Sequence, residues 1–241
     1  GLTFAAVLAG VEHTITCVDT DAHKIQSLKN YQLPLYEPGL HELLFDGAKT
    51  NRITFTNSFD HIQHAHIYYV CVPTPVDAQG GCDSSYVRSA CAAIIAARST
   101  DEPIIVVIKS TVVPGTLRSL HEEFSTPTTN VHFVYNPEFM REGCALQDIR
   151  TRNPIVLGAD SHDALHLVEQ LLTACLPAPT GIIKTNFETA ELIKYSWNTF
   201  SALRIAYVNE LATICRLLGA DIVPVVQGLA LSEQLLPTAQ L

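Results

Sequence analysis

Thr14-Ile-Thr-Cys-Val-Asp19 is a short apolar stretch that ends in an acidic residue, and it stands between helical patterns at residues 1–10 and 21–30. Further strand patterns follow at residues 53–56, 66–72, 103–109, 131–135, 154–158 and 182–185. Helical patterns occupy residues 38–48, 58–64, 84–98, 115–124 and 161–174. Short apolar strands that alternate with helices are typical of parallel βαβ units. The sequence therefore predicts an α/β fold with a doubly wound, Rossmann-like and mostly parallel sheet.

The pattern changes near residue 182. From residue 186 no Pro or Gly interrupts the chain until Gly219, and apolar residues recur in steps of three or four. This spacing predicts one helix of about thirty residues with a continuous apolar face, and a second helix follows at residues 221–231. Thr185 and Glu188 have the spacing of a capping box at the start of the long helix. We therefore expect two domains, residues 1–185 and residues 186–241, and a helix this long usually spans between domains or forms a dimer interface.

Composition and charge exclude several classes of protein. The 241 residues are 47% hydrophobic and only 16% charged, which is typical of a chain with a large buried core. The net charge of −9 argues against a nucleic-acid partner, which requires a basic face. No stretch reaches the roughly 18 uninterrupted apolar residues of a membrane span, so we expect no membrane partner.

Cysteine and histidine usage favours a cytoplasmic protein without a metal. The seven cysteines are an odd number, contain no CxxC pair and mostly lie in apolar runs, which is typical of free thiols in a reducing compartment. His61, His64 and His66 lie close together in the sequence, but their spacing fits no common zinc motif. We therefore expect no metal site.

Asp19 is a candidate cofactor ligand. In a dinucleotide-binding fold, an acidic residue about twenty positions after the glycine-rich turn accepts hydrogen bonds from the adenosine ribose. Asp19 ends a strand at about that distance, and Gly1 stands where the last glycine of the turn would allow close helix–strand packing. An acidic residue that caps the next helix is an equally good interpretation from these residues alone.

Two further groups of polar residues have positions that suit catalysis. Lys194 and Asn198 are four residues apart on the predicted long helix, so they share one face and could hold an oxyanion. Glu138 and Glu142 follow an apolar strand, at the edge where open α/β sheets bind ligands. Without other information, a solvated lysine–asparagine pair and surface carboxylates are the commoner interpretations.

Seven segments, in order and with matching spacing, resemble the UDP-glucose/GDP-mannose dehydrogenase family, and residues 1–10 look like the end of its glycine-rich fingerprint. The segments are Val18-Asp19 with Lys24, Tyr36-Glu-Pro-Gly-Leu40, Val72-Pro-Thr-Pro75, Asp83-x-Ser-Tyr-Val87, Lys109-Ser-Thr-Val-Val-Pro-Gly-Thr116, Asn136-Pro-Glu-Phe-Met-Arg-Glu-Gly143 and Glu191-x-x-Lys-Tyr-x-x-Asn-Thr-Phe200. The resemblance runs along the chain except for its last dozen residues. Within the family it is strongest to the UDP-glucose 6-dehydrogenases.

The resemblance implies NAD as the cofactor and the oxidation of a primary alcohol of a nucleotide sugar to the uronate, by a homodimer that forms across helix 187–219. It implies catalytic roles for Lys194, Asn198, Glu138, Glu142 and Thr111, with Thr111 and Glu142 positioning the hydrolytic water. The implied cofactor-binding residues are Gly1, Asp19, Lys24, Thr74, Thr111 and Glu142. The implied substrate-binding residues are Glu138, Phe139, Met140, Arg141, Lys194 and Asn198.

The resemblance also predicts that the chain is incomplete. We expect the first strand and most of the phosphate turn to precede Gly1, and the family's catalytic cysteine and nucleotide-binding domain to follow Leu241. None of the seven cysteines has the sequence context of that nucleophile. Such a fragment alone is expected to be inactive.

Other activities remain open from the sequence. UDP-glucose is the favoured substrate, and GDP-mannose and UDP-N-acetylmannosamine are those of close relatives in the same family. The β-hydroxyacid dehydrogenases share a Lys-x-x-x-Asn pair but lack the Glu37-Pro-Gly-Leu40 and Pro137-Glu-Phe139 motifs. An inactive truncated remnant is the alternative from a different functional class.

Overall fold

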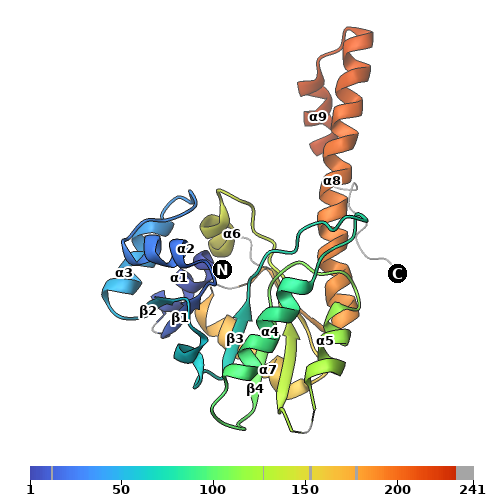
Figure 1. Cartoon of the computed structure of the whole chain (residues 1–241). Helices are drawn as coiled ribbons and strands as arrows, with labels where there is room; N and C mark the ends of the chain where they lie inside the picture. The colour runs from blue at the N-terminus through green and yellow to red at the C-terminus, as the bar shows by residue number, and fades with distance from the viewer. Residues whose placement is uncertain (12, 127, 152–153, 177–178, 232–241) are drawn as a thin grey trace. The chain divides into compact units, whose positions relative to one another are not determined.

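The computed structural model describes residues 1–11, 13–126, 128–151, 154–176 and 179–231. Residues 232–241 of the expected second domain lie outside these ranges. The chain divides into two compact units, Gly1–Lys194 and Tyr195–Leu241, and Figure 1 shows the course of the chain through both.

The first unit contains two sheets. Parallel strands β1 and β2 form one sheet, and the other has the order β3-β4-β5-β6-β7. All neighbouring strands in the larger sheet are parallel except β5 and β6, which are antiparallel. The predicted strands are thereby confirmed, and the sheet is mostly parallel as expected. Their bounds are β1 (Ile15–Val18), β2 (Ile53–Thr56), β3 (Ile67–Val70), β4 (Ile104–Ile108), β5 (Val131–Tyr135), β6 (Pro154–Gly158) and β7 (Gly181–Thr185).

Helices occupy most of the chain between the strands. The α-helices of the first unit are α1 (Leu2–Gly10), α2 (Ala22–Lys29), α3 (Leu40–Lys49), α4 (Ser85–Ala97), α5 (Thr116–Phe124), α6 (Ala145–Thr151) and α7 (His162–Cys175). The helix predicted at residues 58–64 is the shorter 3₁₀-helix η1 (Phe59–Ile62). The long helix α8 (Phe187–Leu218) begins in the first unit and continues into the second.

Strand β4 shows why the larger sheet is covered on both faces. Its five residues are all buried. Alternate side chains of a strand point to opposite faces of the sheet, so both faces must be covered. Val106 and Ile108 join a core with buried residues of α4, α5 and the start of α8. Ile105 and Val107 join a second core with residues of α1, α6 and α7. Helix layers on both faces of a mostly parallel sheet make the predicted doubly wound fold.

The smaller sheet has a core of its own. Helices α1, α2 and α3 contribute buried residues such as Leu28, Leu44 and Phe45, which pack with Ile53 and Phe55 of β2. Gly47 in α3 lies close to Ile53: a Cβ atom there would stand 2.8 Å from Cδ1 of Ile53, so that side chain would have to shift. The small size of this glycine therefore favours close packing of α3 against β2.

Two local features differ from the sequence-based expectations. The capping box of Thr185 and Glu188 is wrong: Thr185 ends β7, and Asn186 Oδ1 accepts the cap hydrogen bond from the Thr189 amide at 2.9 Å. Glu188 instead accepts from Arg118 Nε at 2.9 Å. Helix α6, which follows the Glu138–Gly143 segment, was not predicted, because it is only seven residues long.

The second unit consists of the rest of α8, a turn and helix α9 (Ile222–Ala230). The predicted long helix is confirmed, and it ends at Leu218, before Gly219, which has the positive φ of 68° that favours glycine. The side chain of Asp221 caps α9 by accepting from the Val223 amide at 2.9 Å. Within the described ranges, no helix has the length and apolar character needed to cross a membrane.

Candidate active site at the carboxyl ends of the strands

The polar residues singled out by the sequence follow the carboxyl ends of four strands. Asp19 follows β1, Thr74 follows β3, Thr111 follows β4 and Glu138 follows β5. The carboxyl ends of parallel strands form the ligand-binding edge of an open α/β sheet. Thr74, Thr111 and Glu138 therefore lie at one edge of the larger sheet, after its neighbouring strands β3, β4 and β5, while Asp19 follows β1 of the smaller sheet.

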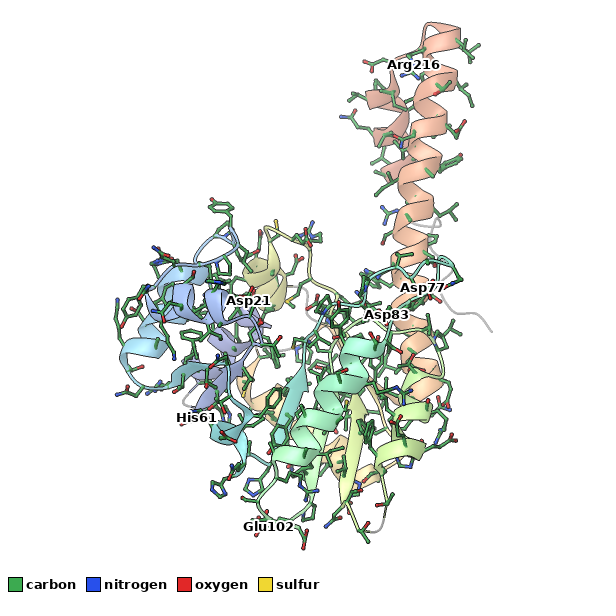
Figure 2. The ribbon with its side chains drawn as sticks, viewed as in Figure 1. Asp21, His61, Asp77, Asp83, Glu102 and Arg216 are labelled. Atoms are coloured by element: carbon green, nitrogen blue, oxygen red, sulfur yellow. The ribbon has the colours of Figure 1, made fainter. Side chains whose placement is uncertain are left out.

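Asp19 and Lys24 form an ion pair at the end of β1, with both side chains only partly exposed. Asp19 Oδ1 also accepts from the Asp21 amide at 3.1 Å. Asp21, labelled in Figure 2, is the residue that caps α2 by accepting from the amides of His23 and Lys24. The helix cap is thus supplied by Asp21, so the carboxylate of Asp19 is not needed for that role.

Gly1 lies against the residue that follows β3. A Cβ atom at Gly1 would stand 3.3 Å from Cβ of Cys71, closer than most such contacts. This is the close packing between helix and strand for which the last glycine of a dinucleotide turn is used. The position of Gly1 therefore fits the role that the sequence suggested for it.

The loops after β3 and β4 are joined by hydrogen bonds. The Thr74 hydroxyl donates to the Thr111 carbonyl at 2.8 Å, and the Ser110 hydroxyl donates to the Val72 carbonyl at 2.6 Å. Thr74 and Thr111 were both predicted to contact the cofactor, and the structure brings them together. In this arrangement the Thr74 side chain supports the backbone of Thr111.

Lys194 is buried, with an exposed fraction of 6%, and its ammonium donates to the Glu138 carbonyl. It also lies 5.2 Å from the centre of the Phe139 ring. Burial lowers the pKa of Lys194, the Glu138 carboxylate opposes this shift, and the charge of Lys109 adds to it. Lys194 is therefore not a solvated helix lysine; its ammonium is held next to the loop after β5.

Asn198 lies four residues further along α8, is exposed and belongs to the second unit. Its pairing with Lys194 remains a sequence-based prediction. Glu142 is also exposed, in a turn in which the Cys144 amide donates to the Arg141 carbonyl at 3.2 Å. The role of Glu142 rests on the motif alone.

Arg141, predicted to contact the substrate, is held by the buried carboxylate of Asp148. The guanidinium donates from Nη2 at 2.6 Å and from Nε at 3.0 Å, and the Arg141 amide donates to the same carboxylate at 2.9 Å. Asp148 lies in α6, and Glu37 holds the start of that helix, because its Oε1 accepts from the Leu146 amide at 3.2 Å. Both carboxylates thus order the segment between Glu138 and α6.

Lys109 is a buried cation to which the sequence analysis gave no role. Its Nζ donates to Asn136 Oδ1 at 3.5 Å and lies 4.7 Å from the centre of the Phe4 ring. Burial is the main cause that lowers the pKa of Lys109. A cavity of about 20 Å³, lined in part by Lys109, Asn136, Glu138 and Met140, has room for one water molecule but not for a sugar. The signal that could have found Lys109 is its place at the end of an otherwise apolar strand.

Two of the thiols and the histidine cluster have no role in this site, whereas Cys82 Sγ donates to the Thr111 carbonyl at 3.9 Å. Burial raises the pKa of Cys17 and of Cys91 to about 12, so neither thiol is an available nucleophile near neutral pH. His66 pairs with Glu102 at 3.3 Å, and Figure 2 shows Glu102 at the end of the unit away from Asp77 and Asp83. No group of three or more His, Cys, Asp or Glu side chains in the described part of the chain is arranged to hold a metal ion.

Comparison with known proteins identifies the family. Residues 1–175 match the NAD binding domain of the UDP-glucose/GDP-mannose dehydrogenase family, and residues 188–239 match the central domain of the same family. UDP-glucose 6-dehydrogenase TuaD of Bacillus subtilis (strain 168) is 36% identical over 243 residues, a match that covers 98% of this chain and 51% of the relative. The chain thus spans about half the length of the curated relatives it matches.

Two solved structures have the same fold. The GDP-mannose dehydrogenase of Pseudomonas aeruginosa superposes with a TM-score of 0.90 at 28% identity, over 98% of this chain and 55% of the other. A UDP-glucose dehydrogenase of Pyrobaculum islandicum has a TM-score of 0.85 at 29% identity, over 97% and 54% of the two chains. These matches cover the site residues described above, and the chain belongs to the UDP-glucose/GDP-mannose dehydrogenase family, of which it carries the NAD-binding domain.

Proposed function

We propose that the protein to which this chain belongs oxidises the primary alcohol of UDP-glucose to the carboxylate of UDP-glucuronate, with NAD⁺ as the oxidant. The observation that carries the proposal is the burial of Lys194 against the loop of Glu138 at the carboxyl edge of the sheet. Burying a charge costs free energy, and here the Glu138 carbonyl offsets part of that cost by accepting from the ammonium. The family match supports the same reaction.

NAD⁺, when bound, supplies the acceptor for the hydride that leaves the sugar carbon. In the proposed arrangement, Asp19 accepts hydrogen bonds from the adenosine ribose and Lys24 orients that carboxylate. Thr111 and Glu142 position the water that completes the oxidation to the acid. Glu138 lies beside the substrate as an acid or a base, next to Phe139, Met140 and Arg141.

Lys194 would hold the oxygen of the alcohol as it loses its proton, with Asn198 as a second donor. An ammonium fixed in a site from which water is excluded stabilises a developing oxyanion more than it stabilises the neutral alcohol. Burial already lowers the pKa of Lys194, so the ammonium gives up a proton more readily than an exposed lysine does. The first property favours the alkoxide from which the hydride leaves, and the second favours the neutral amine, which accepts the proton of the alcohol.

UDP-glucose is proposed over the related substrates because the Lys109-Ser-Thr111 and Glu37-Pro-Gly-Leu40 motifs favour that branch. The relative of 36% identity carries the same activity in its name. GDP-mannose is the second candidate, since the structure with a TM-score of 0.90 is named a GDP-mannose dehydrogenase. UDP-N-acetylmannosamine is a third.

We extend the proposal to domains and assembly. Residues 1–185 form the NAD-binding domain, and residues 186–241 begin a helical domain through which two copies associate. In the second unit, α8 and α9 expose large apolar side chains that water contacts at a cost. They are Trp197, Phe200, Leu203, Ile205, Tyr207, Ile214, Leu217, Leu218, Val223, Val225 and Leu231. Such a surface suits an isologous contact with a second copy.

The substrate assignment is tested with the purified protein that contains this chain. NADH formation is followed at 340 nm with UDP-glucose, GDP-mannose and UDP-N-acetylmannosamine, and the sugar product is identified by mass spectrometry. We expect the highest kcat/KM with UDP-glucose and two NADH for each uronate formed. A higher kcat/KM with GDP-mannose would move the protein to the other branch. No NADH with any of the three would contradict the proposed activity.

A further inference from the structure

Glu191 is fully buried in the first unit, with an exposed fraction of 0%. Its carboxylate accepts two backbone hydrogen bonds: Oε2 from the Gly115 amide at 2.7 Å and Oε1 from the Leu117 amide at 2.8 Å. Both amides lie at the start of α5, where a helix leaves N–H groups without intrahelical partners. Gly115 precedes α5 with a φ of 95° and has no side chain with which to cap it. Glu191 therefore provides the cap from another part of the chain.

The two elements that Glu191 joins both carry proposed site residues. On one side, the loop between β4 and α5 contains Thr111, four residues before Gly115. On the other side, Lys194 lies three residues after Glu191 on α8, so the two side chains share one face of the helix. The Lys194 ammonium reaches the Glu138 carbonyl. Glu191 thus connects the Thr111 loop to the helix turn that presents Lys194.

The start of α8 is also fixed against the sheet, so the connection is rigid. Gly158 at the end of β6 has no room for a Cβ atom, which would lie 2.6 Å from Cβ of Ala190 and 2.8 Å from the Asn186 carbonyl oxygen. Ala190, which makes this contact, and Phe187 are both fully buried. A shift of α8 would therefore move Glu191 and its two bound amides with it.

We propose that Glu191 is a positioning residue that holds the Thr111 loop and Lys194 at a fixed separation for the oxidation of the sugar alcohol. The effect on catalysis rests on the proposed function, but the hydrogen bonds from the Gly115 and Leu117 amides to Glu191 do not depend on it. Glu191 touches neither reacting atom; it acts by fixing the groups that do. A loss of about 1 Å in such alignment can cost on the order of a hundredfold in rate.

The first experiment measures amide hydrogen exchange in the protein with Glu191→Gln. Glutamine keeps the size of the side chain but presents an NH₂ group, which cannot accept, to one of the two amides. We expect the amides of residues 110–113 and 115–117 to exchange about tenfold faster, because a hydrogen bond to a charged acceptor is lost. Glu169→Gln is the matched control: it removes a mostly buried carboxylate that pairs with Lys184 at 3.0 Å, away from this loop. Unchanged exchange at residues 110–117 in Glu191→Gln overturns the proposal.

The second experiment measures turnover with the same variants. We expect Glu191→Gln to lower kcat at least tenfold, with the KM values for NAD⁺ and the nucleotide sugar within about twofold of wild type, because alignment rather than binding is lost. Glu191→Ala, which removes both acceptors, should lower kcat further, while Glu169→Gln keeps wild-type kcat. Faster exchange with unchanged kcat would make Glu191 a structural cap only. If the wild-type protein oxidises no nucleotide sugar, the proposed function fails, and the exchange result alone decides whether Glu191 holds the loop.

Discussion

Helix α8 has two parts that both contain large apolar side chains, but the side chains of the first part are buried and those of the second are exposed. In the first unit, Phe187, Ala190, Glu191 and Lys194 are all buried, although two of the four are ionisable. In the second unit, large apolar side chains such as Trp197 are exposed on the same helix. The comparison shows that polarity alone does not decide burial along this helix. What decides it is whether a partner surface is present and whether each polar group finds a hydrogen-bond partner there.

The two parts therefore have different reasons for their sequences. The buried part is held by specific contacts, in which carboxylate and ammonium groups meet backbone amides and a carbonyl. Buried polar groups are tolerated when they are hydrogen-bonded in this way. The exposed part carries large apolar side chains such as Phe200 and Leu203, and an exposed apolar face is the pattern of a surface that a second copy covers.

The largest expected effect compares two phenylalanines of α8. Phe187→Ala should lower the free energy of unfolding by about 3–5 kcal/mol, because it leaves a cavity in a fully packed core. Phe200→Ala, at a side chain that is 37% exposed, should lower it by less than about 1 kcal/mol at protein concentrations where the chain is monomeric. Urea unfolding of both variants at matched concentration gives the two values.

The same pair sharpens the proposal of a homodimer. At micromolar concentration, light scattering should give twice the chain mass, and Phe200→Ala should raise the dimer dissociation constant by about tenfold or more, as for an aromatic side chain in an interface. Phe187→Ala should affect folding first and association only as a consequence. A stable monomer at these concentrations would leave the apolar face of α8 without the partner that we propose.

The next effect concerns Lys194, the buried cation at the end of the first part. Lys194→Ala should lower kcat at least about a hundredfold, roughly 2.7–4 kcal/mol, because the lost donor acts mainly in the transition state. Affinity for NAD⁺ should change little. Lys184→Ala is the matched control, since Lys184 of β7 is half-exposed and pairs with Glu169 of α7. A folded Lys194→Ala protein that keeps more than a third of wild-type turnover would remove Lys194 from the mechanism.

The sequence predicts most of the fold because the strands follow local rules. The five buried residues of β4, Ile104–Ile108, form an uninterrupted apolar run, and such runs between helical patterns are typical of parallel strands covered on both faces. The long helix was equally clear, since no Gly or Pro interrupts it before Gly219. The antiparallel pairing of β5 and β6 was not predicted, because strand direction depends on how the intervening chain crosses the sheet.

The sequence predicts which residues carry chemistry but not which residues hold them. Asp19 and Lys24 were both predicted, and they meet in the structure because they lie only five residues apart at the start of one helix. Glu37 reaches Leu146, and Glu191 reaches Leu117, across 109 and 74 positions of sequence. No periodicity in one segment encodes such a contact. Helix α6 was missed because it is only seven residues long, and the residue that accepts from its Leu146 amide, Glu37, is far away in the sequence.

The central claim is that the carboxyl ends of these strands bind NAD⁺, with its adenosine ribose at Asp19 after β1 of the smaller sheet. The most direct test is the ratio of kcat/KM for NAD⁺ and NADP⁺. A carboxylate at this place accepts from both ribose hydroxyls and repels a 2′-phosphate. We predict a preference for NAD⁺ of at least about tenfold, roughly 1.4 kcal/mol. Asp19→Ser should reduce the preference, and Asp21→Asn, which keeps a good cap on α2, should not. Equal use of the two cofactors by the wild-type protein would contradict the account.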